Sequence, residues 1–547
     1  MTTRTRGADA LVRAMQNAGV SRLFTLSGNH IMSVFDAALD AGITLVHTRH
    51  EAAAVFMADA WGRLTGEPGV ALVTGGPGHA NAVGALYTAA MSESPVVLLS
   101  GHAPASQLGT GAFQEMRQAD IAAPLTKRAM TSMRTDDIAR DFAAAMRTAR
   151  SGRRGPVHLS LPSDCLDGDA DPAQVPGADA FAADAIALDD GTADAMLARL
   201  RSAKRPLIVA GPMLMTRAGR AAAMRLQDAT GIAVVGMESP RGLADASLGR
   251  FAQMLAQADG VLLLAKRLDY TLKFGKPPAF AATGEILQID ADDEQLARSR
   301  QALGTRLAAS ARAEPFAAIA TLLRRAQAKR PARSGWFDEV SAALAARPAG
   351  WDDARSGQSG RLHPLEALRP LQAFIDRHPD AVLVMDGGEF SQWAQALLNA
   401  PNRVTNGVAG AIGAGLPFGV AARLAQPDAP VIVTMGDGTF GFHPAEIDTA
   451  VRARAPFVAI VGNDARWNAE YQIQLRDYGA NRVGGCELLP TRYDHVAIAF
   501  GGHGECVTRP DAIAPAVERA IASGLPAVVN VALDGQPAPS FEPMKTS

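Results

Sequence analysis

Short runs of apolar residues alternate with helical stretches along the chain. From Ala8, apolar positions recur at the three- and four-residue spacing of a helix, and the apolar pair Leu23-Phe24 follows. The pattern returns at 70–73, where an apolar run ends in Thr74-Gly75-Gly76-Pro77-Gly78 before a new helical stretch begins at Ala80. Continuous apolar runs of strand length between helices are typical of parallel strands that are covered on both faces. The pattern therefore predicts an α/β fold of doubly wound parallel sheets.

Two polar stretches, 168–190 and 347–362, interrupt this alternation and have the composition of linkers. They divide the chain into three predicted α/β domains, 1–167, 190–346 and 363–535, followed by a C-terminal tail, 536–547. The strands expected in the three domains lie at 23–24, 43–46, 70–73, 95–99 and 157–162; at 207–210, 261–264 and 286–289; and at 382–385, 431–434, 457–461 and 527–531.

Composition narrows the classes of function. Hydrophobic residues make up 48% and charged residues 20% of the 547 positions, which is typical of a globular protein. The formal net charge of -2 lacks the basic excess that nucleic acids and anionic membranes attract, so neither is an expected partner. Three scattered cysteines form no disulfide framework, and neither an export signal nor an apolar segment of membrane-spanning length is evident. We expect a cytoplasmic protein that acts on a small molecule.

The most informative segment is Gly436-Asp437-Gly438-Thr439, which follows an expected strand, with Asn463 at the end of the next one. Glycines let backbone amides approach an anionic group, while the Asp437 carboxylate and the Asn463 side-chain oxygen can face the same cation. Hard oxygen ligands of this kind suit Mg²⁺ bound to a diphosphate. An isolated Gly-Asp-Gly is more often an ordinary turn, so the argument depends on its position at a strand end.

With this placement, the segment resembles the signature of thiamine diphosphate-dependent enzymes. The resemblance implies that Asp437, Asn463 and the main-chain carbonyl of Ala465 bind Mg²⁺, although the usual motif has a second Asn where this chain has Gly462. It also implies a glutamate in the first domain that protonates the cofactor's aminopyrimidine. Glu51, which follows the apolar run 43–46, is that candidate; taken alone, it would be a carboxylate at the start of a helix.

Other segments resemble the cofactor-binding loops of the same family. In 410–417, Ile412 would wedge between the two rings of the cofactor and the Gly410 carbonyl would accept from its amino group, whereas the plain alternative for Ile412 is a core residue. Gly388, Glu389 and Phe390 would lie on the diphosphate together with Gly436, Gly438 and Thr439. The family places its glutamate and its metal site on different subunits, which implies at least a homodimer and favours a homotetramer.

Within the family, the chain resembles acetolactate synthases, benzaldehyde lyase, and the oxalyl-CoA decarboxylases with the 2-hydroxyacyl-CoA lyases. His30 stands where benzaldehyde lyase has a substrate-side histidine, and Gln114 lies in a segment similar to the loop that brings a glutamine to the cofactor. Segment 267–278 resembles the 2-hydroxyacyl-CoA lyases and lacks the charged run of acetolactate synthases. Trp467 and Tyr471 would line the substrate pocket. A packed core histidine, a surface amide and packing aromatics are the alternatives for these four residues.

The resemblance therefore implies a C–C lyase or carboligase that acts on 2-hydroxy carbonyl compounds or 2-hydroxyacyl-CoA thioesters, through a carbanion and enamine formed on thiamine diphosphate. Glu51, His30 and Gln114 would be its catalytic residues. The alternatives are an acetolactate synthase-type transferase that condenses 2-oxo acids, a 2-oxo acid decarboxylase, a flavin-dependent oxidase and a non-catalytic assembly protein. The strand end at Asp290 could hold an adenosine ribose or belong to a vestigial nucleotide fold, so FAD, ADP or no ligand in the central domain all stay open.

Overall fold

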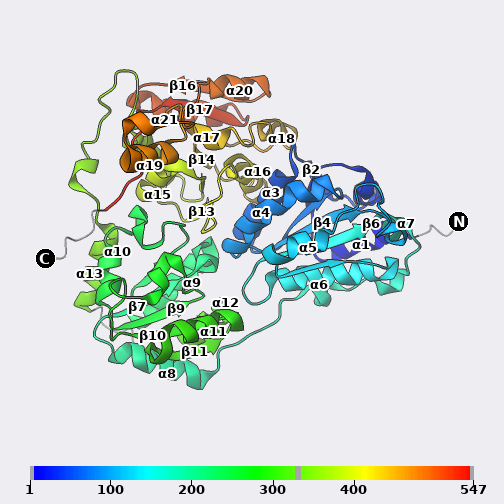
Figure 1. Ribbon diagram of the computed structural model, residues 1–547, viewed down its shortest axis with the longest axis horizontal. Coiled ribbons are helices and arrows are strands. Elements are labelled where there is room, and N and C mark those ends of the chain that lie inside the picture. The colour runs from blue at the N-terminus through cyan, green and yellow to red at the C-terminus, as the bar shows by residue number, and fades with distance from the viewer. Residues whose placement is uncertain (1–4, 327–333, 542–547) are drawn as a thin grey trace. The chain divides into compact units, whose positions relative to one another are not determined.

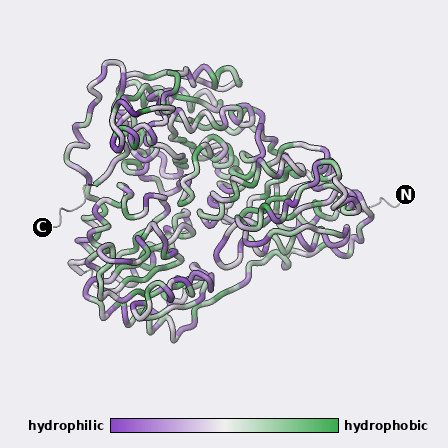
Figure 2. The backbone as a smooth tube through the Cα atoms, viewed as in Figure 1, coloured by the Kyte–Doolittle hydropathy of each residue, from purple (hydrophilic) through white to green (hydrophobic). Residues whose placement is uncertain are grey.

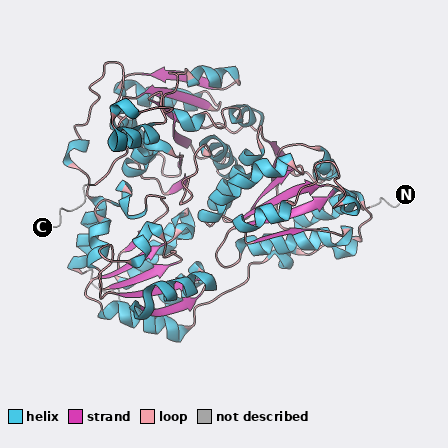
Figure 3. Ribbon diagram, viewed as in Figure 1, coloured by secondary structure: helices cyan, strands magenta, loops and turns pink. Residues whose placement is uncertain are grey.

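The computed structural model describes residues 5–326 and 334–541 (Figure 1). These residues form three parallel β-sheets flanked by helices (Figure 3), which confirms the predicted α/β class. They belong to two compact units. The first comprises residues up to Asp184 together with 416–427 and 443–455, and contains the first sheet. The second comprises the other segments and contains the second and third sheets.

The first sheet has six parallel strands in the order β2-β1-β3-β4-β6-β5. Its strands are β1 (Arg22–Thr25), β2 (Thr44–His47), β3 (Gly69–Val73), β4 (Val96–His102), β5 (Arg128–Thr131) and β6 (Pro156–Pro162). The helices of this unit are α1 (Gly7–Asn17), α2 (Met32–Asp40), α3 (Glu51–Thr65), α4 (Pro77–Met91), α5 (Gln118–Ala122), α6 (Ile138–Arg150) and α7 (Ser163–Asp167), with most of α16 (Gly415–Ala425) and α18 (Glu446–Arg452).

The second sheet has five parallel strands in the order β11-β10-β9-β7-β8. Its strands are β7 (Pro206–Ala210), β8 (Val234–Gly236), β9 (Gly260–Leu264), β10 (Glu285–Asp290) and β11 (Leu307–Arg312), and its helices are α8 (Asp190–Ser202), α9 (Arg217–Thr230), α10 (Phe251–Gln257), α11 (Asp293–Leu303), α12 (Pro315–Ala326) and α13 (Gly335–Ala345). Along β7, Ile208 packs into the core on one face of the sheet, and its neighbours Leu207 and Val209 pack into the core on the other. Because successive strand residues face opposite sides, one apolar run supplies both cores.

The third sheet has six parallel strands in the order β13-β12-β14-β15-β17-β16. Its strands are β12 (Val382–Met385), β13 (Asn402–Thr405), β14 (Val431–Gly436), β15 (Val458–Asn463), β16 (His503–Val507) and β17 (Ala527–Ala532), and its helices are α14 (Pro364–Arg377), α15 (Gly388–Leu397), α17 (Asp437–Phe440), α19 (Asn468–Tyr478), α20 (Tyr493–Ala499) and α21 (Ile513–Ala522). The interior strands β12 and β14 are largely hydrophobic, and segments of this kind are green in Figure 2. Their burial against helices on both faces accounts for the continuous apolar runs in the sequence.

Outside the sheets, the predicted linkers 168–190 and 347–362 contain only short helical turns before α8 and α14 begin. Cys165, Cys486 and Cys506 are free thiols. No helix within the described residues is both long and apolar enough to span a membrane. The tail is described as far as Phe541, and its last six predicted residues, 542–547, lie outside the described part, as do 327–333 of the central domain. The proposed domain boundaries stay a prediction.

Candidate active site

Three neighbouring strands of the third sheet end in carboxylates. β14 pairs with β12 on one side and with β15 on the other, and Gly436 lies opposite Gly462 in the register. Asp386 follows β12, Asp437 follows β14, and Asp464 follows β15. Ligand sites of parallel sheets lie beyond the carboxyl ends of the strands. The topology therefore brings these three acids to one edge of the sheet.

A cavity of about 210 Å³ opens at this edge. It is lined by nearly all the residues that the sequence predicts to hold the cofactor, namely Gly388, Glu389, Phe390, Gly410, Ile412, Gly436, Gly438 and Thr439, together with Asp437 and Trp467. Asp464, Arg241 and Arg466, which the sequence analysis did not single out, also line it. Asn463, Ala465 and Tyr471 do not belong to the lining, although the Tyr471 ring lies 4.2 Å from the Arg466 guanidinium carbon.

The Asp386 carboxylate holds one wall of this cavity. It is fully buried and accepts hydrogen bonds from the backbone N–H groups of Gly387 at 2.6 Å, Gly413 at 3.1 Å and Gly415 at 2.9 Å. Burial raises the pKa of Asp386 to about 6, against the opposing effect of these N–H donors. The carboxylate thus ties the glycine-rich segment around Ile412 to the end of β12. Its position directly after an apolar run was the available signal in the sequence.

Three carboxylate oxygens of the cavity lining have no hydrogen-bond partner within the described residues, and one of them is Glu389 Oε2. Asp437 Oδ2 and Asp464 Oδ1 are both buried and unpaired within the described chain. Burial raises the pKa of Asp437 to about 6, whereas burial and then the nearby charge of Asp437 raise the pKa of Asp464 to about 7. Buried polar atoms are nearly always satisfied, so the unpaired oxygens of Asp437 and Asp464 in one cavity are compatible with a bound cation. They make a donor set that suits Mg²⁺, which usually takes one or two carboxylates from a protein.

Asn463 and Ala465 form hydrogen bonds within the protein and do not line the cavity. The Asn463 amide group donates to the Thr491 carbonyl at 2.9 Å and to Asn530 Oδ1 at 3.1 Å, and its own oxygen accepts from the Ala465 N–H at 3.2 Å. The Ala465 carbonyl accepts from the Leu488 N–H at 2.7 Å. The hydrogen bonds of these two predicted metal ligands therefore fix the loop after β15. Asp464 lines the cavity, whereas Asn463 does not. No group of three or more His, Cys, Asp or Glu side chains with metal-binding geometry occurs in the described residues.

Position 462, at the end of β15, has room only for a glycine. A Cβ atom there would lie 2.4 Å from Phe390 Cγ and 2.7 Å from Leu533 Cδ1, so a side chain such as the Asn of the usual motif has no room. We expect Gly462→Ala to lower the free energy of unfolding by about 1–3 kcal/mol through overpacking. Gly436→Ala on the paired strand is the control, because nothing lies within 4 Å of its added Cβ. Thermal denaturation of both variants is the measurement, and an equal loss in both would contradict the expectation.

In the first unit, Glu51 is the first residue of α3 and is 8% exposed. Its Oε2 accepts a hydrogen bond from Asn81 Nδ2 of α4 at 3.1 Å. The adjacent Arg49 N–H donates to Glu446 Oε1 of α18 at 3.0 Å, which fixes the chain just before the helix. A carboxylate at a helix N-terminus is favoured by the helix dipole, and here it is buried as well. Asn81 of α4 therefore holds the Glu51 carboxylate, and Glu446 of α18 holds the backbone two residues before it.

His30 and Gln114 lie at the carboxyl end of the first sheet. His30 is 5% exposed, its Nδ1 lies 3.2 Å from Thr74 Oγ1, and its ring stacks on Phe113. Burial lowers the pKa of His30, which favours a neutral ring. Gln114 has a left-handed backbone conformation, with φ of 56°, in the loop that packs against Gly76. The structure therefore brings both predicted residues to the turn between β3 and α4.

The tail, which the sequence could not place, is fixed beside the third sheet. The Gln536 carbonyl accepts from Asn468 Nδ2 at 2.8 Å, and the Pro537 carbonyl accepts from Trp393 Nε1 at 3.0 Å. Burial raises the pKa of Glu389, while a backbone hydrogen bond from Ala538 and the charge of Arg241 oppose the shift. The tail therefore covers helices α15 and α19 next to the cavity.

Comparison with known protein families agrees with this arrangement. The N-terminal TPP binding domain of thiamine pyrophosphate enzymes matches residues 5–121, their central domain matches 193–314, and their C-terminal TPP binding domain matches 386–531. The chain belongs to the thiamine pyrophosphate enzyme family. Thiamine pyrophosphate, the same molecule as thiamine diphosphate, is accordingly the cofactor of these domains, and the protein is an enzyme.

Relatives of this thiamine pyrophosphate enzyme span almost its whole length. A probable acetolactate synthase from Mycobacterium bovis is 33% identical over 96% of this chain and 95% of its own. The 2-hydroxyacyl-CoA lyase 2 of Homo sapiens is 30% identical over 96% and 89%. A 2-hydroxyacyl-CoA lyase from Oryza sativa subsp. japonica is 29% identical over 95% and 94%. The enzyme thus belongs to the group that contains acetolactate synthases and 2-hydroxyacyl-CoA lyases.

Proposed function

We propose that the protein is a Mg²⁺-dependent C–C lyase or carboligase that acts on 2-hydroxy carbonyl compounds, 2-hydroxyacyl-CoA thioesters among them. The observation that carries the Mg²⁺ dependence is the pair of buried, unpaired oxygens of Asp437 and Asp464 in the glycine-lined cavity. The lyase assignment draws on the human and rice relatives named 2-hydroxyacyl-CoA lyase and on the positions of His30 and Gln114.

The Mg²⁺ ligands in this proposal are the carboxylates of Asp437 and Asp464. A main-chain carbonyl two residues after the second ligand would complete the protein's set, which moves that role from Ala465 to Arg466. The hydrogen bonds of Asn463 and of the Ala465 carbonyl support this one-residue change of register. Backbone amides of the glycine-rich turns around Gly388 and Gly438 would face the diphosphate.

When bound, thiamine diphosphate supplies an electron sink next to the carbonyl carbon whose C–C bond breaks or forms. Ile412 and Gly410 would orient the cofactor from the segment that Asp386 anchors. Glu51 would hold a proton at the cofactor's pyrimidine nitrogen. His30, kept neutral by burial, would accept the proton of the substrate hydroxyl, with Gln114 as a hydrogen-bonding partner of the substrate oxygen.

The substrate side of the cavity is aromatic. Trp467 packs against Gly438, where an added Cβ would lie 2.7 Å from the indole, and its ring meets Phe442 edge-on at 6.1 Å. Tyr471 lies one turn further along α19 under Arg466. These groups favour a substrate with an apolar or aromatic acyl portion. We also propose a cytoplasmic homodimer or homotetramer, since the family's glutamate and metal site belong to different subunits.

The second candidate is a transferase that condenses 2-oxo acids, favoured by the 33% identity to a probable acetolactate synthase. A substrate panel separates the two. The protein, loaded with thiamine diphosphate and Mg²⁺, is incubated with pyruvate, benzoin-type ketols and 2-hydroxyacyl-CoA esters, and the products are identified. Cleavage of ketols or thioesters to aldehydes supports the lyase. Acetolactate from pyruvate with no cleavage of the other substrates would assign the transferase instead.

We expect the stabilisation by Mg²⁺ and thiamine diphosphate to grow as the pH rises from about 5.5 to about 8. The raised pKa values of Asp437, about 6, and Asp464, about 7, mean that the folded metal-free protein holds protons that the unfolded chain has already released. The folding stability of the metal-free protein therefore falls as the pH rises through this window. A bound cation offsets this loss by interacting with the ionised carboxylates. The measurement is the shift in melting temperature on adding both ligands. A shift independent of pH would contradict the pairing of these carboxylates with a cation.

A further inference from the structure

A buried glutamine lies under the segment 74–78, which connects β3 to α4 in the first compact unit. Gln118 is the first residue of α5 and is 1% exposed. Its Oε1 accepts from the Gly76 N–H at 2.8 Å, and its Nε2 donates to the Gly101 carbonyl of β4 at 3.1 Å and to Ser160 Oγ of β6 at 2.9 Å. Because β3, β4 and β6 are neighbours in the sheet, one side chain joins three adjacent strands near their carboxyl ends.

His30 lies directly against two of the stretches that Gln118 joins. Its Nδ1 is 3.2 Å from Thr74 Oγ1, at the start of segment 74–78. On the other side, a Cβ atom added to Gly101 would lie 2.6 Å from the Cβ of His30, so the backbone of β4 packs against the histidine with nothing between them. The position of the His30 ring therefore depends on backbone that the Gln118 amide fixes.

Segment 74–78 also borders the other two predicted catalytic residues. A Cβ atom added to Gly76 would lie 2.8 Å from the Cβ of Gln114, and one added to Gly78 would lie 3.3 Å from Glu51 Oε1. Gly76 has φ of 60°, in the left-handed region that favours glycine, and its N–H is the group that bonds to the buried amide below. One short stretch of backbone thus sets the places of both side chains.

Only an amide suits this position. Gln118 accepts on one side and donates twice on the other, whereas a carboxylate has no donor and an apolar side chain has neither group. The surroundings are also uncharged: Ser160 Oγ lies 3.4 Å from His158 Nε2, and burial lowers the pKa of the His158 imidazole well below its ordinary value. A neutral group that donates and accepts completes this buried layer without adding a charge to it.

Resting on the lyase function proposed above, we infer that Gln118 is a positioning residue for the reaction: it holds segment 74–78 so that His30, Gln114 and Glu51 keep the mutual orientation that proton transfer requires. It acts through these three side chains. Its own amide bonds to the protein on both sides and is buried beneath the segment.

The test is Gln118→Met, which keeps the length of the side chain and removes its hydrogen bonds. In the protein loaded with thiamine diphosphate and Mg²⁺, we expect the kcat for cleavage of a benzoin-type ketol to fall by about 10- to 100-fold, since a displacement of about 1 Å costs up to about 10²-fold. The KM should change little, because the lost order concerns proton transfer more than binding. Steady-state kinetics are the measurement.

The pH profile and the chemical reactivity of His30 separate positioning from a general loss of structure. Burial lowers the pKa of His30, a backbone hydrogen bond with Phe113 opposes this shift, and the nearby His102 adds to the lowering. The acid limb of kcat should therefore lie below pH 6.5 in the wild type and move up toward 6.5 in Gln118→Met, where a displaced segment admits water. Modification of His30 by diethyl pyrocarbonate, followed by peptide mapping of the loaded protein, should be several-fold faster in the variant.

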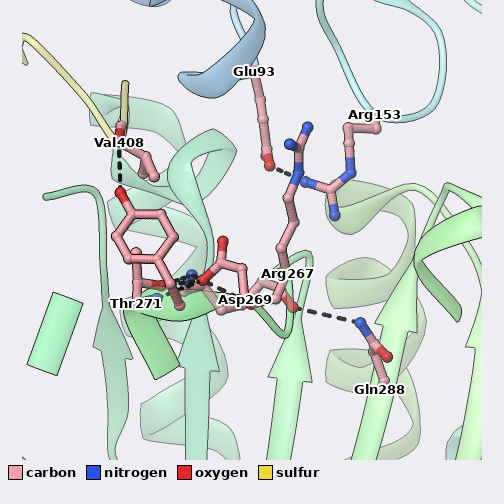
Figure 4. Close-up of polar contacts among 9 residues, drawn as sticks. Glu93, Arg153, Arg267, Asp269, Thr271, Gln288 and Val408 are labelled. Carbon is pink, nitrogen blue, oxygen red and sulfur yellow. Dashed lines mark hydrogen bonds and ion pairs between the residues drawn. The ribbon is translucent and has the colours of Figure 1, made fainter. Parts of the chain in front are cut away.

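Two further variants serve as comparisons. Glu93 lies beyond the opposite end of α4 and forms a buried ion pair with Arg153 (Figure 4). Glu93→Gln should lower the melting temperature at least as much as Gln118→Met, because it leaves a buried charge unpaired, yet it should leave kcat and the acid limb unchanged. Ser160→Ala removes one acceptor and keeps the two backbone contacts of the glutamine, so its kcat should fall far less than that of Gln118→Met.

An unchanged kcat in Gln118→Met would overturn the inference. So would a fall in kcat without a change in the acid limb and in the modification rate of His30, or equal changes in Glu93→Gln. The modification rate does not depend on which reaction the enzyme catalyses. If the wild type forms acetolactate and cleaves no ketol, the lyase function is wrong, whereas faster modification with the same changes of kcat and acid limb for acetolactate formation would still assign the positioning role to Gln118.

Discussion

Glu51→Gln is expected to lower turnover by about 100-fold or more while the protein still binds thiamine diphosphate and Mg²⁺. A positioned proton-transfer group typically contributes a factor of about 10²–10⁴. Glutamine has the same shape and keeps an oxygen that can accept from Asn81 Nδ2, so the fold and the contact between α3 and α4 should persist. It cannot, however, hold the exchangeable proton at the cofactor's pyrimidine. Steady-state kinetics and calorimetric titration of the cofactor are the measurements.

The control for this variant is Glu67→Gln. Glu67 lies just beyond α3, is about half exposed and, among the described residues, pairs with Arg150 at the surface. Its loss should leave turnover unchanged, because exposed ion pairs contribute little. Full activity of Glu51→Gln, or a loss of activity explained by failure to bind the cofactor, would remove the proposed role of Glu51.

Asp464→Ala is expected to weaken Mg²⁺-dependent binding of thiamine diphosphate by at least about 100-fold, since partners that only support metal ligands already cost 10–100-fold when removed. In the metal-free protein the same change should leave the melting temperature equal or higher, because it removes one of two buried carboxylates that repel each other. The loaded protein should melt at a lower temperature than the loaded wild type. Opposite signs of the two shifts would be the signature of a metal ligand.

Asn463→Ala is the matched comparison, one residue away. Its side chain bonds to Thr491 and Asn530, so its loss should lower the melting temperature with and without ligands. The affinity for Mg²⁺ should change less than tenfold, and Asp464→Asn, which retains an oxygen ligand, should recover part of the loss seen in Asp464→Ala. The reverse ranking, with Asn463→Ala the more damaging to Mg²⁺ affinity, would return the metal to Asn463.

The sequence identifies all the interior strands and one edge strand, β2, and misses the other five edge strands. All the strands that it predicts exist, from β1 at Leu23-Phe24 to β17. The strands without a prediction are β5, β8, β11, β13 and β16, and each stands at the edge of its sheet. An edge strand pairs on one side only and is partly exposed, so its residues need not be apolar: β5 reads Arg-Ala-Met-Thr and β16 reads His-Gly-Glu-Cys-Val. Hydrophobic runs therefore predict the interior strands of a sheet but fail to predict most of its edge strands.

The sequence identifies the loops that form the site. In our proposal, the second metal ligand is Asp464, one residue after the predicted Asn463. Gly-Asp-Gly and the segments around Gly388 and Ile412 line one cavity as expected. Asn463 and Asp464 both carry oxygen ligands and stand side by side, so composition alone does not choose between them. The choice depends on hydrogen-bond partners at Thr491 and Asn530, 28 and 67 residues further along the chain. Distant partners of this kind leave no local signal in a single sequence.

The helices from 416–427 and 443–455 belong to the first compact unit, although the family model assigns these residues to the C-terminal domain. Phe418 meets the ring of Phe56 edge-on at 5.9 Å, and His443 meets the same ring at 5.8 Å. A gene fragment that stops at Asp184 would lose both aromatic neighbours and leave the surface of α3 uncovered. Recombination that exchanges the N-terminal domain between relatives would therefore have to carry compatible α16 and α18 sequences with it.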